Sequence, residues 1–165
     1  MVCRTLAFCA TLVCLNTLTP ATVADDESTF ERACHRISAL SAKSDTSFRD
    51  SSGRLAGSAS PAGPDRVTFR DRSGRLTDTA ATSGGRTTFR DSSGRLTGTA
   101  TESGGRIAFR DSSGRLTGTA TTSGGRMTFR DSSGRLTGST TTHGSQTTCR
   151  DSSGRLVGTS RQRAR

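Results

Sequence analysis

Tryptophan and tyrosine are absent from this 165-residue sequence, in which only 4% of the residues are aromatic and 29% are hydrophobic. Folding so polar a chain around one compact core would bury too little apolar surface to offset the entropy of ordering it. The composition therefore argues against an ordinary single-core globular domain. It favours a repetitive architecture or, alternatively, a disordered low-complexity chain.

Lysine is also nearly absent, since Lys43 is the only one, although the net charge is +10. Almost every cation is therefore arginine, whose planar guanidinium suits carboxylate, phosphate and sulfate groups. A basic surface of this kind favours polyanionic partners such as nucleic acid, anionic glycans, lipid headgroups or acidic proteins. The competing interpretation is that the arginines pair with acidic residues of the chain itself and keep it soluble.

Residues 1–24 have the pattern of a cleavable secretory signal peptide. Arg4 supplies the positive charge, an apolar run follows at residues 6–15, and small residues at 21–24 offer a cleavage site before Asp25. The apolar run is too short to span a bilayer, which favours a signal peptide over an uncleaved anchor. The mature chain is then expected to be secreted or periplasmic.

From Phe48 to the end, one phrase of about twenty residues is repeated six times. Each copy has an alternating segment around Phe-Arg-Asp, a turn of the Asp-Ser-Ser-Gly kind and a second alternating segment after Leu. Each copy is therefore predicted to be a β-hairpin, because Asp accepts backbone hydrogen bonds in such turns and Gly adopts their positive φ.

The expected fold class is all-β, an antiparallel β-hairpin repeat array over residues 48–165 with a basic tail. One twenty-residue hairpin cannot offset its own ordering entropy, so Phe and Leu are expected to stack between neighbouring copies. We predict that the array forms a curled sheet or a β-solenoid-like stack.

One short helix is predicted between the signal peptide and the repeats, within residues 25–47. Ser28 and Glu31 fit a capping box at its start. Apolar residues then recur on one helical face, namely Phe30, Cys34, Ile37 and Leu40. The amphipathic helix is therefore expected over residues 28–41, followed by a polar link.

Two cysteines remain in the mature chain, Cys34 in the predicted helix and Cys149 in place of the repeat phenylalanine. In an exported protein such a pair favours one disulfide. The bond forms within one chain if the array closes or curls back, which we favour, and between self-associating chains if the array stays open. In a third interpretation both stay unpaired and Cys149 fills a phenylalanine pocket.

The segment 89–96, Phe-Arg-Asp-Ser-Ser-Gly-Arg-Leu, resembles the YD-type repeats of the RHS family, in which an aromatic residue and Asp precede Gly-Arg-Leu. The resemblance covers residues 48–157, with Phe in place of Tyr and Arg always before the Asp. It implies a β-hairpin array in an exported bacterial protein. It does not imply the family's toxin-enclosing shell, because six copies are too few to enclose a cargo. Arrays that bind choline or glucan are a second likeness, but their stacking Trp and Tyr are missing here.

Candidates for catalysis are few. The mature chain has only two histidines, His35 and His143, and no third group marks a Cys-His pair. The repeated Asp residues have a structural role at the head of each turn. Zinc-ligand types occur at Cys34, His35, His143 and Cys149, but the long gap between them argues against a site. We predict a non-enzyme with no cofactor, metal or small-molecule substrate.

The arginines recur in three registers of the repeat, and the candidate polyanion-binding residues are Arg86, Arg90, Arg95, Arg106, Arg110, Arg115, Arg126, Arg130 and Arg135. If the copies stack in register, each set becomes a row of guanidinium groups that follows a linear polyanion. We therefore expect an exported structural or binding repeat protein whose partner is an anionic glycan, lipopolysaccharide or another polyanion. The alternatives are a disordered or purely structural surface or periplasmic spacer. Nucleic-acid binding is less favoured, because the phenylalanines alternate inward and cannot stack on bases.

The exported protein is expected to begin near Asp25, because signal peptidase cleaves after small residues. Intact-mass spectrometry of the secreted or periplasmic form measures this directly. A mass that still includes Met1 would contradict the signal-peptide interpretation.

Overall fold

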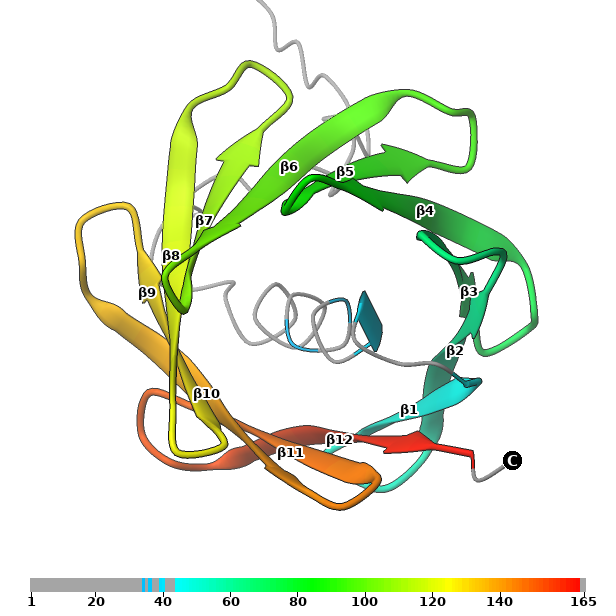
Figure 1. The fold of residues 1–165 in the computed structure, drawn as a ribbon. Helices are drawn as coiled ribbons and strands as arrows, with labels where there is room; N and C mark the ends of the chain where they lie inside the picture. Colours follow the sequence, from blue (N-terminus) through cyan, green and yellow to red (C-terminus); the bar gives the residue numbers. More distant parts are fainter. Residues whose placement is uncertain (1–33, 35, 37–38, 41–43, 164–165) are drawn as a thin grey trace, which may run out of the picture.

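The computed structural model describes residues 34, 36, 39–40 and 44–163. Twelve antiparallel strands follow one another around a closed barrel (Figure 1). The strands are β1 (Thr46–Asp50), β2 (Leu55–Pro61), β3 (Arg66–Asp71), β4 (Leu76–Ser83), β5 (Arg86–Asp91), β6 (Leu96–Ser103), β7 (Arg106–Asp111), β8 (Leu116–Ser123), β9 (Arg126–Asp131), β10 (Leu136–His143), β11 (Gln146–Asp151) and β12 (Leu156–Gln162).

The pairing of β1 with β12 closes the ring. Asp50 faces Gly158 across this pair, just as Asp111 faces Gly98 between β7 and β6. The sixth copy therefore meets the first in the register in which consecutive copies meet, and the ring of described strands has no free edge. The predicted all-β hairpin array is confirmed. The curled sheet and the β-solenoid-like stack are wrong, because the terminal strands pair with each other and close a barrel.

Two kinds of turn alternate along the chain and lie at opposite ends of the barrel. One end, here called the aspartate end, carries the turns at residues 50–54, 71–75, 91–95, 111–115, 131–135 and 151–155. The other, here called the glycine end, carries the connections at residues 61–66, 83–86, 103–106, 123–126 and 143–146. At the glycine end, Gly84 and Gly85 have φ of 56° and 74°. A tight two-residue turn of the type I′ kind requires such positive values at both positions.

The inner face of the barrel is formed by one repeating set of side chains. Five buried phenylalanines and one cysteine share a register, namely Phe48, Phe69, Phe89, Phe109, Phe129 and Cys149. Small residues stand beside them, as Ala100 does beside Phe109. Glycine permits close strand approach at neighbouring inner positions, because a Cβ on Gly98 would lie 2.5 Å from the main-chain oxygen of Arg110. The inward orientation expected for the phenylalanines is therefore confirmed.

The repeat leucines lie outside this core, contrary to the expectation that they would stack within it. Phe89 faces Gly98, but the next residue, Arg90, faces Leu96 rather than Thr97. This β-bulge moves the leucine from the phenylalanine face to the arginine face. Leu136 is accordingly 39% exposed.

The barrel encloses part of the N-terminal region, here called the inner segment and defined by Cys34, Arg36, Ala39 and Leu40. These residues have helical backbone and lie within the ring of strands (Figure 1). Cys34 and Ala39 are buried in one cluster with the repeat phenylalanines. Eight strands enclose an interior that side chains alone can fill, whereas twelve enclose a wider one. The inner segment therefore completes the core.

Two predictions for the N-terminal region are not tested by this fold. The predicted helix over residues 28–41 lies mostly outside the described residues and stays a prediction, as does the signal peptide at 1–24. Within the part of the chain that the structure describes, no helix is both long and apolar enough to cross a membrane.

Replacing Thr117 or Thr97 by valine should stabilise the barrel by about 1 kcal/mol or more. The hydroxyls of both are buried, and among the described residues neither has a hydrogen-bond partner. The sixth copy already carries Val157 in this position, 2% exposed. Thermal and urea unfolding of each variant measures the change.

Thr77→Val is the matched control, because the Thr77 hydroxyl donates a hydrogen bond to the Phe69 carbonyl at 3.2 Å. This variant should be neutral or less stable than the unmodified protein. Equal changes in stability at Thr77 and Thr117 would show that the unpaired hydroxyl of Thr117 does not destabilise the barrel.

Candidate anion-binding surface

Each turn at the aspartate end is organised by one carboxylate. In the turn at residues 91–95, Asp91 Oδ1 accepts hydrogen bonds from the Ser93 amide at 2.9 Å, the Ser93 hydroxyl at 2.6 Å and the Arg95 amide at 3.0 Å. The Gly94 amide donates to the Asp91 carbonyl at 3.0 Å. The same pattern recurs in all six copies. The structural role expected for the repeat Asp is visible in these bonds.

These hydrogen bonds stabilise the charged form of the carboxylate. The Ser93 hydroxyl lowers the pKa of Asp91 most, the Arg95 and Ser93 amides lower it further, and the Arg95 charge adds the smallest contribution. The pKa values of the other five turn aspartates are lowered for the same reasons. Serine and main-chain amides, rather than arginine side chains, therefore satisfy the turn aspartates.

The arginine before each turn aspartate lies along the outside of its own turn. Arg90 Nη1 donates to the Gly94 carbonyl at 2.8 Å. Equivalent bonds of 2.7–2.9 Å hold Arg49, Arg70, Arg110, Arg130 and Arg150. One of five guanidinium N–H donors suffices for this bond. All six side chains are exposed, so they form a ring of oriented guanidinium groups near the aspartate end.

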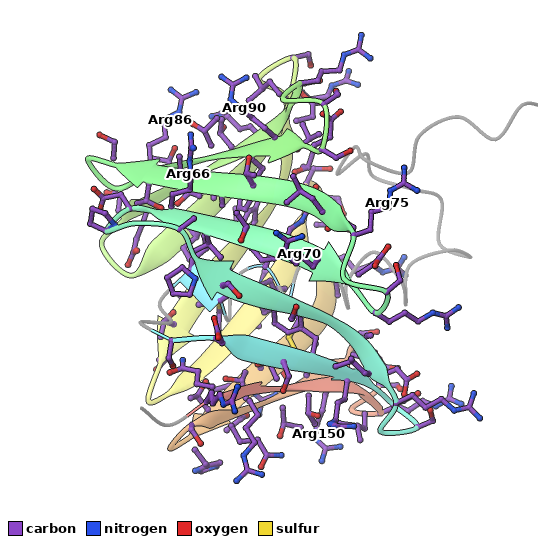
Figure 2. The ribbon with its side chains drawn as sticks, turned by 90° about the vertical axis from the view of Figure 1, so that its right-hand side faces the viewer. Arg66, Arg70, Arg75, Arg86, Arg90 and Arg150 are labelled. Atoms are coloured by element: carbon purple, nitrogen blue, oxygen red, sulfur yellow. A yellow bond between two sulfur atoms is a disulfide. The ribbon has the colours of Figure 1, made fainter. Side chains whose placement is uncertain are left out.

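The arginine after each turn forms a second ring at the tips of the same end, made of Arg54, Arg75, Arg95, Arg115, Arg135 and Arg155. Their backbone amides bond to the turn aspartates, while their side chains are exposed. Figure 2 shows Arg75 at this end and Arg70 on the outer wall next to it. Copies are two strands apart, so equivalent arginines recur about every 10 Å around the barrel.

The third predicted register lies at the other end of the barrel. Arg86, Arg106 and Arg126 follow the glycine turns, and Figure 2 shows Arg86 and Arg66 toward that end. Four residues of strand, about 13 Å, separate Arg86 from Arg90. The structure therefore brings together the two registers of the aspartate end and separates the third. It also bends each predicted row into a ring, because the sheet is closed.

In the part of the chain that the structure describes, the arginines of all three registers lack carboxylate partners. Within the described residues, the one ion pair joins Arg36 of the inner segment to Asp78. Each aspartate-end turn has one aspartate, held by serine and amides, and two arginines, to which the second copy adds Arg72. The end therefore presents a positive surface whose charge is not cancelled by direct pairing.

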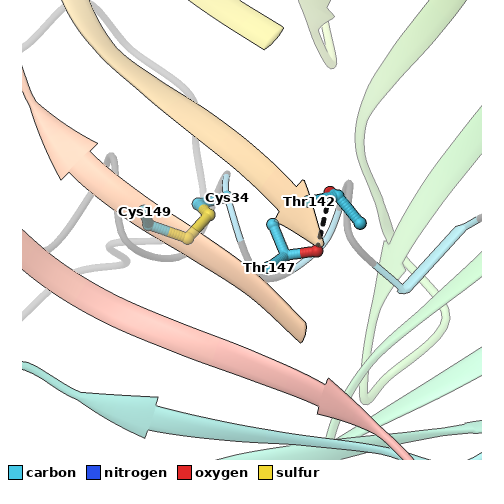
Figure 3. Close-up of a disulfide and its surroundings, with 4 residues drawn as sticks. All are labelled: Cys34, Thr142, Thr147 and Cys149. Carbon is cyan, nitrogen blue, oxygen red and sulfur yellow. Dashed lines mark hydrogen bonds between the residues drawn. A yellow bond between two sulfur atoms is a disulfide. The ribbon is translucent and has the colours of Figure 1, made fainter. Parts of the chain in front are cut away.

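Inside the barrel, a disulfide and an ion pair join the inner segment to the strands, and the sequence predicts only the disulfide. Cys34 and Cys149 form a disulfide with a Cα–Cα distance of 6.4 Å (Figure 3). The Arg36–Asp78 pair was missed. Its signal was present in the sequence, because Asp78 occupies the position that glycine holds in the other five copies.

The histidine and metal candidates are not brought together. His143 is exposed at the glycine end, Cys34 and Cys149 are bonded to each other, and His35 lies outside the described residues. Among the residues described, no group of three or more His, Cys, Asp or Glu side chains could hold a metal ion.

The stability of the barrel should fall when the pH drops below about 4. The pKa values of the turn aspartates are lowered from 3.8 in the folded protein, so their contribution is complete above that value and is lost as the pH falls through the folded pKa values. Melting temperatures measured from pH 7 to pH 2.5 check this.

Asp111→Asn is the control for this pH dependence, because it removes one titrating group and keeps an oxygen in the turn. Its melting temperature should be lower at neutral pH and should fall less on acidification. A melting temperature that is constant down to pH 2.5 in the unmodified protein would rule out the titration of these turns.

The arrangement described here has two arginine rings at one end of a closed hairpin barrel and a covalently anchored segment inside it. Comparisons of the chain with protein-family models, with curated proteins and with solved structures found no match. The exposed rings and the buried anchors are therefore the features from which a function is inferred.

Proposed function

We propose that this protein is an exported, non-enzymatic repeat barrel that binds a polyanion at its aspartate end. The supporting observation is the pair of arginine rings there, which are exposed and have no carboxylate partner among the described residues. A ligand that spans neighbouring copies meets equivalent guanidinium groups repeatedly and gains affinity from that repetition. Anionic glycans and the phosphates of lipopolysaccharide are the polyanions that an exported protein encounters first.

The orientation of the first ring favours binding over a purely solubilising role. The bond from Arg90 to the Gly94 carbonyl holds the guanidinium in place before any ligand arrives. Binding to a preorganised side chain costs less conformational entropy than binding to a free one. A surface that only kept the protein soluble would not need six such bonds.

The closed barrel weakens the two competing functions. A spacer would use the number of copies to set its length, but here the copies set a circumference. Binding of single-stranded nucleic acid relies on exposed aromatic side chains for stacking. The five repeat phenylalanines are all buried, at 2–7% exposure.

Replacing Arg95, Arg115, Arg135 and Arg155 by glutamine should weaken retention on heparin and on immobilised lipopolysaccharide. These tip arginines make no side-chain bond within the described structure, so the fold should be retained. At about 0.15 M salt the affinity should fall about tenfold or more, since each exposed charge pair contributes about 0.5 kcal/mol. Salt-gradient elution and a binding isotherm measure the effect.

The matched control replaces Arg66, Arg86, Arg106 and Arg161 toward the glycine end by glutamine, which changes the net charge by the same amount. We expect this variant to elute close to the unmodified protein. Equal losses in the two variants would mean that net charge, not the aspartate end, drives retention. Unchanged retention of both variants would contradict polyanion binding and favour a purely structural role for the protein.

A further inference from the structure

Two of the contacts between the inner segment and the barrel are made by residues that depart from the repeat. Asp78 on β4 stands where the other copies have glycine, and Cys149 on β11 stands where they have phenylalanine. Asp78 pairs with Arg36, and Cys149 is bonded to Cys34. Both departures from the repeat therefore occur at residues that bind the inner segment, which lies outside the repeats.

The ion pair is largely shielded from water. Arg36 Nη2 donates to Asp78 Oδ1, and the two side chains are only 15% and 10% exposed. The Arg36 guanidinium also lies over the Phe89 ring, with 5.6 Å from Cζ to the ring centroid. Removing one member of a buried pair leaves the other charge without compensation. The ion pair therefore favours one position of the inner segment inside the barrel.

The disulfide anchors the same segment to another wall. Cys34 and Cys149 are both 0% exposed, and 115 residues separate them in the sequence. In the order of strands around the barrel, β4 and β11 lie on nearly opposite sides (Figure 1). The two anchors, which are two residues apart in the inner segment, thus link nearly opposite walls across the interior.

We infer that the disulfide and the Arg36–Asp78 pair form a redox latch that fixes the inner segment in the barrel core under oxidising conditions. On oxidation the two thiols pass two electrons and two protons to a disulfide-containing oxidant, which leaves as two thiols. With Cys34 and Cys149 reduced, only the ion pair and apolar contacts hold the inner segment. The ion pair places the two sulfurs for bond formation, and the bond then makes that placement permanent.

The burial of both sulfurs makes the closed latch resistant to reduction. Thiol–disulfide exchange requires a thiolate to reach a sulfur atom. A small dithiol can do this only after the barrel opens locally. The rate at which it reduces the disulfide therefore measures how firmly the inner segment is held. When exchange occurs, both cysteines become thiols and the dithiol becomes a cyclic disulfide.

The first test compares the oxidised mature protein with its reduced form and with a Cys34→Ser, Cys149→Ser double variant. The oxidised protein should run as a compact monomer in non-reducing electrophoresis. Its melting temperature should exceed that of the other two by about 10–20 °C, because the bond closes a long loop. The double variant should not respond to reductant. Equal melting temperatures, or a ladder of disulfide-linked multimers, would overturn the latch.

The second test measures how fast dithiothreitol exposes the two thiols, by alkylation and mass spectrometry under native conditions. Asp78→Asn removes the charge that seats Arg36, and reduction should become about tenfold faster. Asp65→Asn removes a carboxylate from an exposed connection at the glycine end and should leave the rate unchanged. Equal rates in the two variants would show that the ion pair does not hold the segment.

Discussion

The register in which β12 meets β1 is the constraint on which the rest of the structure depends. Because this pair repeats the relation between any two consecutive copies, the hydrogen-bond ladder closes without a seam. Closure converts every repeated position into a ring. Phenylalanines ring the interior, arginines ring the outside, and the turns gather at two ends. A chain with 29% hydrophobic residues forms a core in this way because each copy completes its neighbour's.

Closure also encloses an interior that the side chains of the repeats do not fill alone. Their inner face has one phenylalanine or cysteine per copy beside smaller residues, and a Cβ at Gly57, Gly98 or Gly118 would lie 2.5 Å from a main-chain oxygen of the neighbouring strand. The interior therefore needs a core element from elsewhere in the chain. The inner segment has this role, and at its two anchors Asp78 and Cys149 replace the repeat glycine and phenylalanine. In this nearly uniform repeat, the departures at Asp78 and Cys149 mark the positions where the barrel binds the inner segment.

Local chemistry made much of this fold predictable from the sequence. Asp91 at the head of its turn, the glycines with positive φ and the alternation around Phe109 each identify a hairpin without long-range information. Closure was not predictable in the same way, because the register of β1 on β12 depends on sheet curvature. The leucine face was misjudged because a bulge shifts the alternation by one residue. Asp78 stands out when the six copies are compared, but the sequence does not identify its partner, because Arg36 lies outside the repeats.

The equivalence of all six interfaces has a consequence for how such a chain can change. Recombination between copies adds or removes whole twenty-residue units, and each product keeps the same local pairing. Local pairing alone therefore does not count copies. The inner segment makes the number of copies matter, because its two anchors lie on nearly opposite walls of the six-copy ring. A ring with five or seven copies would place the partners of Cys34 and Arg36 differently relative to each other.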